Sequence, residues 1–100
     1  MPKYLIHRNV PGAHEMSPDE LHVASNKSCD ALDYLGPDVQ WQQSFVTKDT
    51  ITCVYVGRDE GIIREHARLS GFPADRIQVI EHEIGPATAE PRQAAALTTT

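Results

Sequence analysis

The stretch from Trp41 to Ile77, WQQSFVTKDTITCVYVGRDEGIIREHARLSGFPADRI, decides the order of the structural elements in this chain. Apolar and polar residues alternate over 39–46, which predicts a half-buried strand. After a turn at 48–50, the β-branched and aromatic residues of 51–56 predict a central strand. Residues 60–70 then predict a helix, because Asp59 can cap its start and Gly71 can end it.

The front half of the chain supplies the missing elements. Residues 3–8 predict a strand, and the segment 17–20 (SPDE) predicts a helix start, because its serine and glutamate can form a capping box around a first-turn proline. Apolar residues recur at helical spacing up to Gly36, and residues 77–84 alternate as a last strand. The order β-α-β-β-α-β and the handedness of crossovers predict an α+β, ferredoxin-like sandwich, in which an antiparallel four-stranded sheet carries both helices on one face.

Length and composition indicate one small domain. We place a ferredoxin-like domain at residues 1–85 and a disordered C-terminal tail at residues 86–100, where Gly, Pro, Ala and Thr follow without periodicity. A domain of this size buries only about 60 to 65% of its unfolded surface. Because the strand at 51–56 is apolar on both sides, we expect a homodimer, an assembly of the dimeric α+β barrel type, to cover the open face of the sheet.

The net charge and the cysteines restrict the partners and the cellular compartment that we expect. The net charge of -5 argues against a nucleic-acid partner, which requires a basic face. The chain shows no signal peptide and no apolar run near 18 residues, so we expect a cytoplasmic protein with no membrane partner. Cys29 and Cys53 have no CxxC spacing, and we expect both to be thiols.

Candidate site residues come from strand ends and from the second helix. The topology predicts that His7, Cys53, Tyr55 and His66 converge at one end of the sheet. Imidazole and thiolate select nickel, copper and zinc over magnesium or calcium. His7, His66 and Cys53 are therefore the candidate metal ligands, in a chain that contains no HExxH, CxxC or HxH motif.

The same residues also fit two other functions. A small-molecule enzyme or binding protein would use a pocket between sheet and helices lined by His66, Tyr55, His7 and Trp41, with Tyr55 as catalytic acid and His66 as base. Trp41 and Tyr55 fit a dimer interface equally well. A histidine on an apolar helical face is often a hydrogen-bonded core residue, so an interaction module without a site is the third hypothesis.

Several segments carry a resemblance to a known family. They are Val10-Pro11-Gly12, Trp41 with Ser44-Phe45-Val46, Thr52-Cys53-Val54-Tyr55, Ile63-Arg64-Glu65-His66-Ala67 and Gly71-Phe72-Pro73-Ala74-Asp75-Arg76-Ile77. Over roughly residues 3 to 83 the chain resembles the small bacterial proteins of the domain of unknown function DUF4242, which include a streptomycete nickel-binding, ferredoxin-like homodimer.

The resemblance implies a fold, an assembly and a metal. It implies a ferredoxin-like homodimer, and a small cytosolic protein that binds nickel or another late first-row metal. His7 and His66 stand at histidine positions of the family. The nickel-binding branch carries two adjacent histidines at the first of these positions, whereas here His7 is followed by Arg8.

Overall fold

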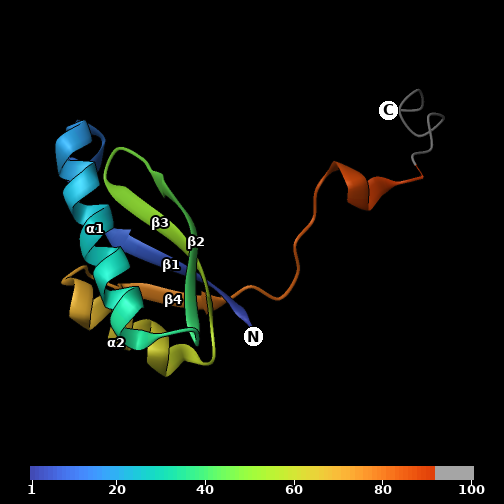
Figure 1. Cartoon of the computed structure of the whole chain (residues 1–100). Helices are drawn as coiled ribbons and strands as arrows, with labels where there is room; N and C mark the ends of the chain where they lie inside the picture. The colour runs from blue at the N-terminus through green and yellow to red at the C-terminus, as the bar shows by residue number, and fades with distance from the viewer. Residues whose placement is uncertain (92–100) are drawn as a thin grey trace.

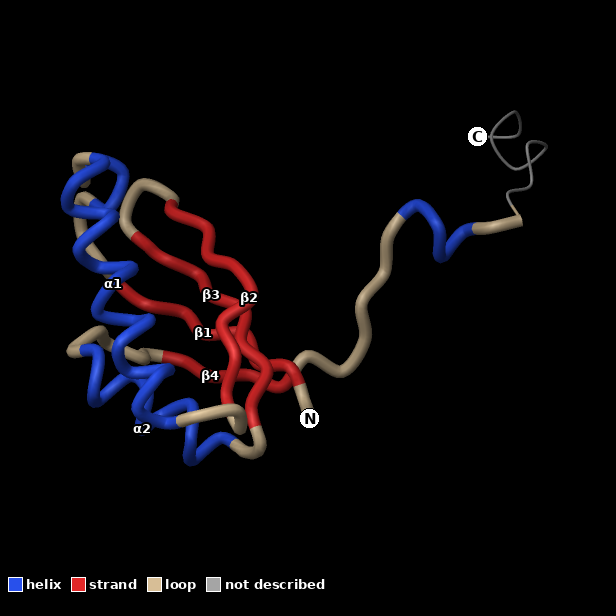
Figure 2. Tube along the Cα trace, viewed as in Figure 1, coloured by secondary structure: helices blue, strands red, loops and turns tan. Residues whose placement is uncertain are grey.

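The computed structural model describes residues 1–91, and it has the expected order of elements. The elements are β1 (Lys3–Asn9), the 3-10 helix η1 (Ala13–Glu15), α1 (Pro18–Leu35), β2 (Val39–Val46), β3 (Thr50–Gly57), α2 (Glu60–Ser70), β4 (Arg76–Val79) and the 3-10 helix η2 (Pro86–Ala89). The strands form one antiparallel sheet in the order β2-β3-β1-β4. Both long helices lie on the same face of this sheet (Figures 1 and 2), which confirms the α+β, ferredoxin-like prediction. No helix in the described part of the chain is long and apolar enough to cross a membrane.

The last strand is shorter than expected, ending at Val79 instead of residue 84. β1 is its partner, and the ladder runs out at the beginning of β1, where the backbone N–H of Ile80 donates to the Lys3 carbonyl at 2.9 Å. Pro2, which precedes β1, has no N–H to continue the ladder. The chain beyond β4 leads away from the sheet and is exposed from 81 to 91 (Figure 1). Most of the expected tail, 92–100, lies outside the described residues.

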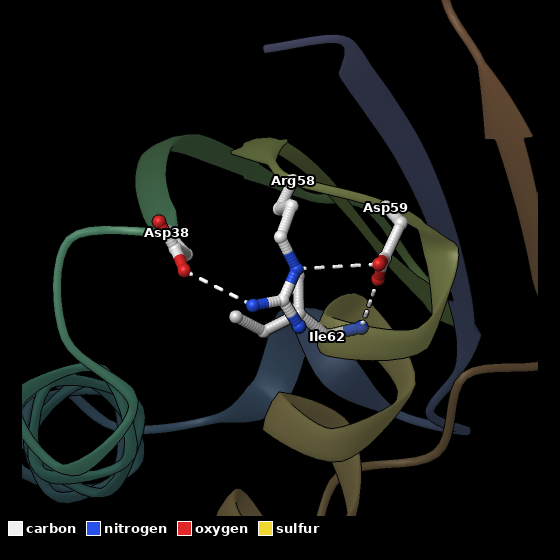
Figure 3. Close-up of polar contacts among 4 residues, drawn as sticks. All are labelled: Asp38, Arg58, Asp59 and Ile62. Atoms are coloured by element: carbon white, nitrogen blue, oxygen red, sulfur yellow. Dashed lines mark hydrogen bonds and ion pairs between the residues drawn. The ribbon is translucent and has the colours of Figure 1, made fainter.

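Side chains cap both helices as the sequence predicts. Ser17 and Glu20 form the capping box of α1, each accepting from the other's backbone N–H at 3.1 Å. Asp59 accepts from the backbone N–H of Ile62 at 2.9 Å, and Arg58 donates to Asp59 and to Asp38 (Figure 3). The hydrogen bond from Ile62, helped by Arg58, lowers the pKa of Asp59. This network fixes the point at which the chain leaves β3 and enters α2.

A bulge in β2 changes which of its side chains face the helices. Strict alternation places Phe45 on the same face as Trp41, but the register shifts between Trp41 and Gln43. Beyond this shift, Ser44 pairs with Cys53 on the helix-covered face. Phe45 therefore lies on the open face, where its side chain is 53% exposed.

The core lies between the helices and the sheet. Ile6, Ile63 and His66 are fully buried there. Gly57, at the end of β3, allows α2 to approach closely, because a Cβ at this position would lie 2.8 Å from the Cδ1 of Ile63. The packing of α2 on β3 therefore depends on the absence of a side chain at Gly57.

We expect Gly57→Ala to lower the free energy of unfolding by about 1 to 3 kcal/mol, the range for overpacking a core. Besides the Cδ1 of Ile63, the Cγ1 of Ile63 and the Cγ2 of Ile62 would lie 3.3 Å from the added Cβ, so two buried side chains would have to shift. Ile63→Val removes the Cδ1 methyl, and in this background Gly57→Ala is expected to cost less. Urea unfolding of the natural chain, both single variants and the double variant measures the coupling. Strictly additive losses would show that the contact does not limit the packing.

Candidate functional site

The two faces of the sheet carry different candidate residues. Alternation along β1 and β3 places Arg8, Cys53 and Tyr55 on the helix-covered face, where each is at most 5% exposed. His7 follows the opposite alternation and lies on the open face, half-buried. The structure therefore does not bring His7 together with the other candidates in one chain.

Tyr55, Ser28 and His66 form a buried hydrogen-bonded group that links β3, α1 and α2. The Ser28 hydroxyl lies 3.1 Å from the Tyr55 hydroxyl and 3.1 Å from Nε2 of His66. Nε2 also lies 3.3 Å from the Ser28 carbonyl. We assign the proton to Nε2, which then donates to Ser28. This leaves only a lone pair without a partner at Nδ1, which costs less than a buried N–H without an acceptor.

Burial keeps the imidazole of His66 and the hydroxyl of Tyr55 neutral. Desolvation lowers the pKa of His66, the hydrogen bond that Nε2 donates to the Ser28 carbonyl raises it, and the charge of Arg8 adds to the lowering. Desolvation also raises the pKa of Tyr55. The tyrosine and the histidine rings lie 4.8 Å apart between centroids. With the proton on Nε2, the imidazole presents a donor and no lone pair to Ser28, so the base role of His66 toward Tyr55 requires the tautomer that carries its proton on Nδ1.

A second polar group surrounds the sulfur of Cys53. The sulfur accepts from Nε of Arg8 at 3.4 Å and from the Ser44 hydroxyl at 2.9 Å. Ser44 in turn accepts from the indole N–H of Trp41 at 2.9 Å. Because the cationic guanidinium is in contact with this sulfur, a dication beside Cys53 would be repelled.

A cavity of about 80 Å³ separates α1 from the helix-covered face of the sheet. Arg8, Trp41, Cys53 and Tyr55 line its sheet side, and Ser28 lines its helix side. His66 does not line the cavity, but it contacts two residues that do, Ser28 by a hydrogen bond and Tyr55 by ring packing. Of the four residues expected to line a pocket, Tyr55 and Trp41 do so, His66 stands one hydrogen bond away, and His7 is on the other face.

On the open face, His7 contacts a polar side chain of the neighbouring strand. Its Nε2 lies 3.2 Å from Oε1 of Gln78 in the neighbouring strand β4. The amide oxygen can only accept, so Nε2 carries the proton and the Nδ1 lone pair is left as a possible metal donor. No group of three or more His, Cys, Asp or Glu side chains suited to a metal occurs among residues 1–91.

Three residues between the helices and the sheet enter the site beyond the sequence-based candidates. Arg8 continues the alternation of Tyr4 and Ile6, so its position in the strand alone indicates that it points toward the helices. Ser28 falls within the apolar stripe of α1, where a hydroxyl indicates a buried polar contact. Ser44 carries no such signal, because only the bulge in β2 turns it inward.

The fold and these contacts define a small α+β protein of the ferredoxin-like class, with a largely apolar cavity under one helix and a sheet face that neither long helix covers. The sequence profile of the nickel responsive protein SCO4226-like family matches residues 4–80, and the chain belongs to this family. The crystal structure of SCO4226 from Streptomyces coelicolor A3(2) has a similar fold, with a TM-score of 0.65 and 24% identity over 82% of this chain and 99% of that one. Comparison with curated proteins gives no match.

Proposed function

We propose that this protein binds a late first-row transition metal of the nickel class, with His7 as a ligand on the open sheet face of a cytoplasmic homodimer. Membership of a nickel-responsive family supports a metal-related role. The single observation that carries the ligand assignment is the contact between His7 and Gln78. We also infer that DUF4242 and the matched family describe the same group of proteins, because the two likenesses span nearly the same residues.

The contact with Gln78 resembles the way proteins orient a histidine ligand. Metal-binding histidines almost always donate their second ring N–H to an oxygen, which fixes the ring and raises its basicity. Here Nε2 of His7 donates to Gln78, and Nδ1 is left for the metal. Imidazole nitrogen suits nickel, copper and zinc. His66 and Cys53, the other candidate ligands, lie behind the sheet and cannot reach an ion at Nδ1 of His7.

One imidazole is too few for a stable site, and a second chain supplies more. A two-fold dimer presents every ligand twice, so a site near the axis gains a second His7. The open face supports such an assembly, because no helix within residues 1–91 covers its half-buried Leu5, Val54 and Val56, and Phe45 is 53% exposed beside them. An uncovered apolar face of this kind marks an interaction surface.

Val54→Glu tests the dimer and the bridging site together. The natural chain is expected to sediment at about twice 11.1 kDa. Charged carboxylates facing each other across the axis should make the variant monomeric and weaken nickel binding at least tenfold, even though His7 is intact. Tyr34→Glu is the control, because Tyr34 is 80% exposed on α1. A monomeric natural chain would contradict the dimer, and a monomeric variant with unchanged nickel affinity would contradict the bridging site.

Small-molecule binding in the cavity beneath α1 is a second candidate function. The observation that favours it is the convergence of two buried polar groups on one cavity, one through Tyr55 and Ser28 and the other through Arg8 and Cys53. Tyr55 and His66 are the candidate acid and base of this site. Binding here would be independent of the open face.

A further inference from the structure

Arg8 carries a positive charge into the interior without a carboxylate to balance it. The side chain is 2% exposed, and it forms no ion pair with any residue from 1 to 91. A guanidinium stays protonated in proteins, and an unbalanced buried charge is costly. The chain therefore keeps a cation at a position where an apolar residue of similar size would give a more stable fold.

The contacts of Arg8 leave part of its hydrogen-bonding capacity free. Nε donates to the Cys53 sulfur at 3.4 Å, and Nη1 donates to the Pro73 carbonyl at 2.6 Å. The ring of Phe72 lies 5.9 Å from the guanidinium carbon. A guanidinium has five N–H donors; Nε and Nη1 use two of them, and Arg8 also lies close enough to the Tyr55 hydroxyl to work against the rise in its pKa. Donors for a flat, two-oxygen anion thus remain at the wall of the cavity.

The cavity limits what such an anion can be. At about 80 Å³ it is about half the size of a 150 Å³ cavity that holds benzene, so it suits a molecule of a few non-hydrogen atoms. Apart from Arg8 and a few hydroxyls, much of its lining is apolar, including Leu21, Val46 and Ile51. Val46 is 42% exposed at the sheet edge, which indicates where a ligand can enter.

We propose that the cavity beneath α1 binds a short-chain monocarboxylate, with its carboxylate on the Arg8 guanidinium and its alkyl end against Leu21, Val46 and Ile51. A carboxylate matches the planar fork of arginine and neutralises the buried charge. The apolar wall favours a short tail over a fully hydrated anion such as phosphate. The proposal deepens the second candidate function and rests on it, and it does not depend on nickel.

The only tryptophan of the chain, Trp41, lines this cavity and reports on its contents. Sodium propionate is expected to change the Trp41 fluorescence saturably and to raise the thermal midpoint of the natural chain, because a ligand that binds only the folded state stabilises it. Propionamide, which has the same shape without the charge, is expected to bind at least tenfold more weakly. Sodium chloride at matched ionic strength controls for salt.

Arg8→Met removes the charge while filling a similar volume, and it is expected to weaken propionate binding at least tenfold. Its thermal midpoint without ligand should match or exceed that of the natural chain, because an unbalanced buried charge is gone. Arg64→Met is the matched control, since Arg64 is exposed on α2 and pairs with Glu60. If Arg8→Met does not fold, Ala24→Leu fills the cavity with Arg8 intact and should also prevent binding.

Four results would overturn the proposal: no saturable response to propionate, an equal response to propionamide, a preference for inorganic phosphate, or unchanged propionate affinity in Arg8→Met. His7→Ala separates this proposal from the metal site. Propionate binding should survive His7→Ala, and nickel binding should survive Arg8→Met. If the natural chain binds nickel but not propionate, the proposal for the cavity fails. If it binds propionate but not nickel, the proposal for the metal site fails.

Discussion

His66→Ala is expected to lower the free energy of unfolding by about 3 kcal/mol or more, the range for truncating a large buried ring to alanine. His66 is fully buried, and its Nε2 is the donor that ties α2 to Ser28 of α1. The total stability of a small domain is on the order of 5 to 15 kcal/mol, so this loss is a large share. Urea unfolding followed by Trp41 fluorescence measures it.

His66→Gln is the matched variant, because its amide can still donate to Ser28 while occupying less space. It should lose less stability than His66→Ala. If His66→Ala costs under about 1 kcal/mol, the ring does not hold the two helices together. Its place beside Tyr55 would then have to be explained by chemistry alone.

The same histidine makes stability depend on pH. Its folded pKa is lowered, so between that value and the unfolded value near 6.5 the unfolded chain holds a proton that the folded chain does not. Stability therefore falls as pH drops through 6.5 toward the lowered folded pKa, with a slope of at most about 1.4 kcal/mol per pH unit for one proton. His66→Gln keeps all other histidines, so the difference between the two curves isolates this ring. Parallel curves would contradict the assignment.

His7→Ala is expected to have the largest effect on metal binding, a loss of nickel affinity of at least tenfold. The substitution removes the one imidazole on the open face that Gln78 orients. It changes a half-buried residue, so stability should change little. His82→Ala is the control, because His82 is exposed beyond β4. Isothermal titration with nickel compares the three chains, and unchanged affinity in His7→Ala would exclude it as a ligand.

Most of the fold could be predicted from local signals. The capping box at Ser17 and the cap at Asp59 mark both helix starts, and the start of α2 agrees with the structure to the residue. The length of β4 was not predictable from its own alternation, because it ends where its partner β1 begins. A strand pattern shows which residues can pair, and the partner decides how many do.

The candidate site was predictable in part. The alternation of side chains along β1 separates the residues that lie in the site from those that do not. Tyr4, Ile6 and Arg8 share one face of β1, so His7 necessarily belongs to the other face. The order of the elements suggested that His7 and His66 meet at one end of the sheet, but the alternation along β1 places His7 on the open face, away from the helix that carries His66. Arg8 could have been recognised by the same rule as a buried charge. The inward turn of Ser44 depends on a bulge that no local pattern indicated.

Native mass spectrometry of tag-free protein, before and after addition of nickel, measures the assembly and its metal content together. We expect a mass twice that of the chain, carrying a whole number of nickel ions per dimer, and a nickel-free dimer for His7→Ala. Zinc and copper in parallel samples establish how selective the site is. A dimer or monomer that retains no stoichiometric metal would contradict the proposal.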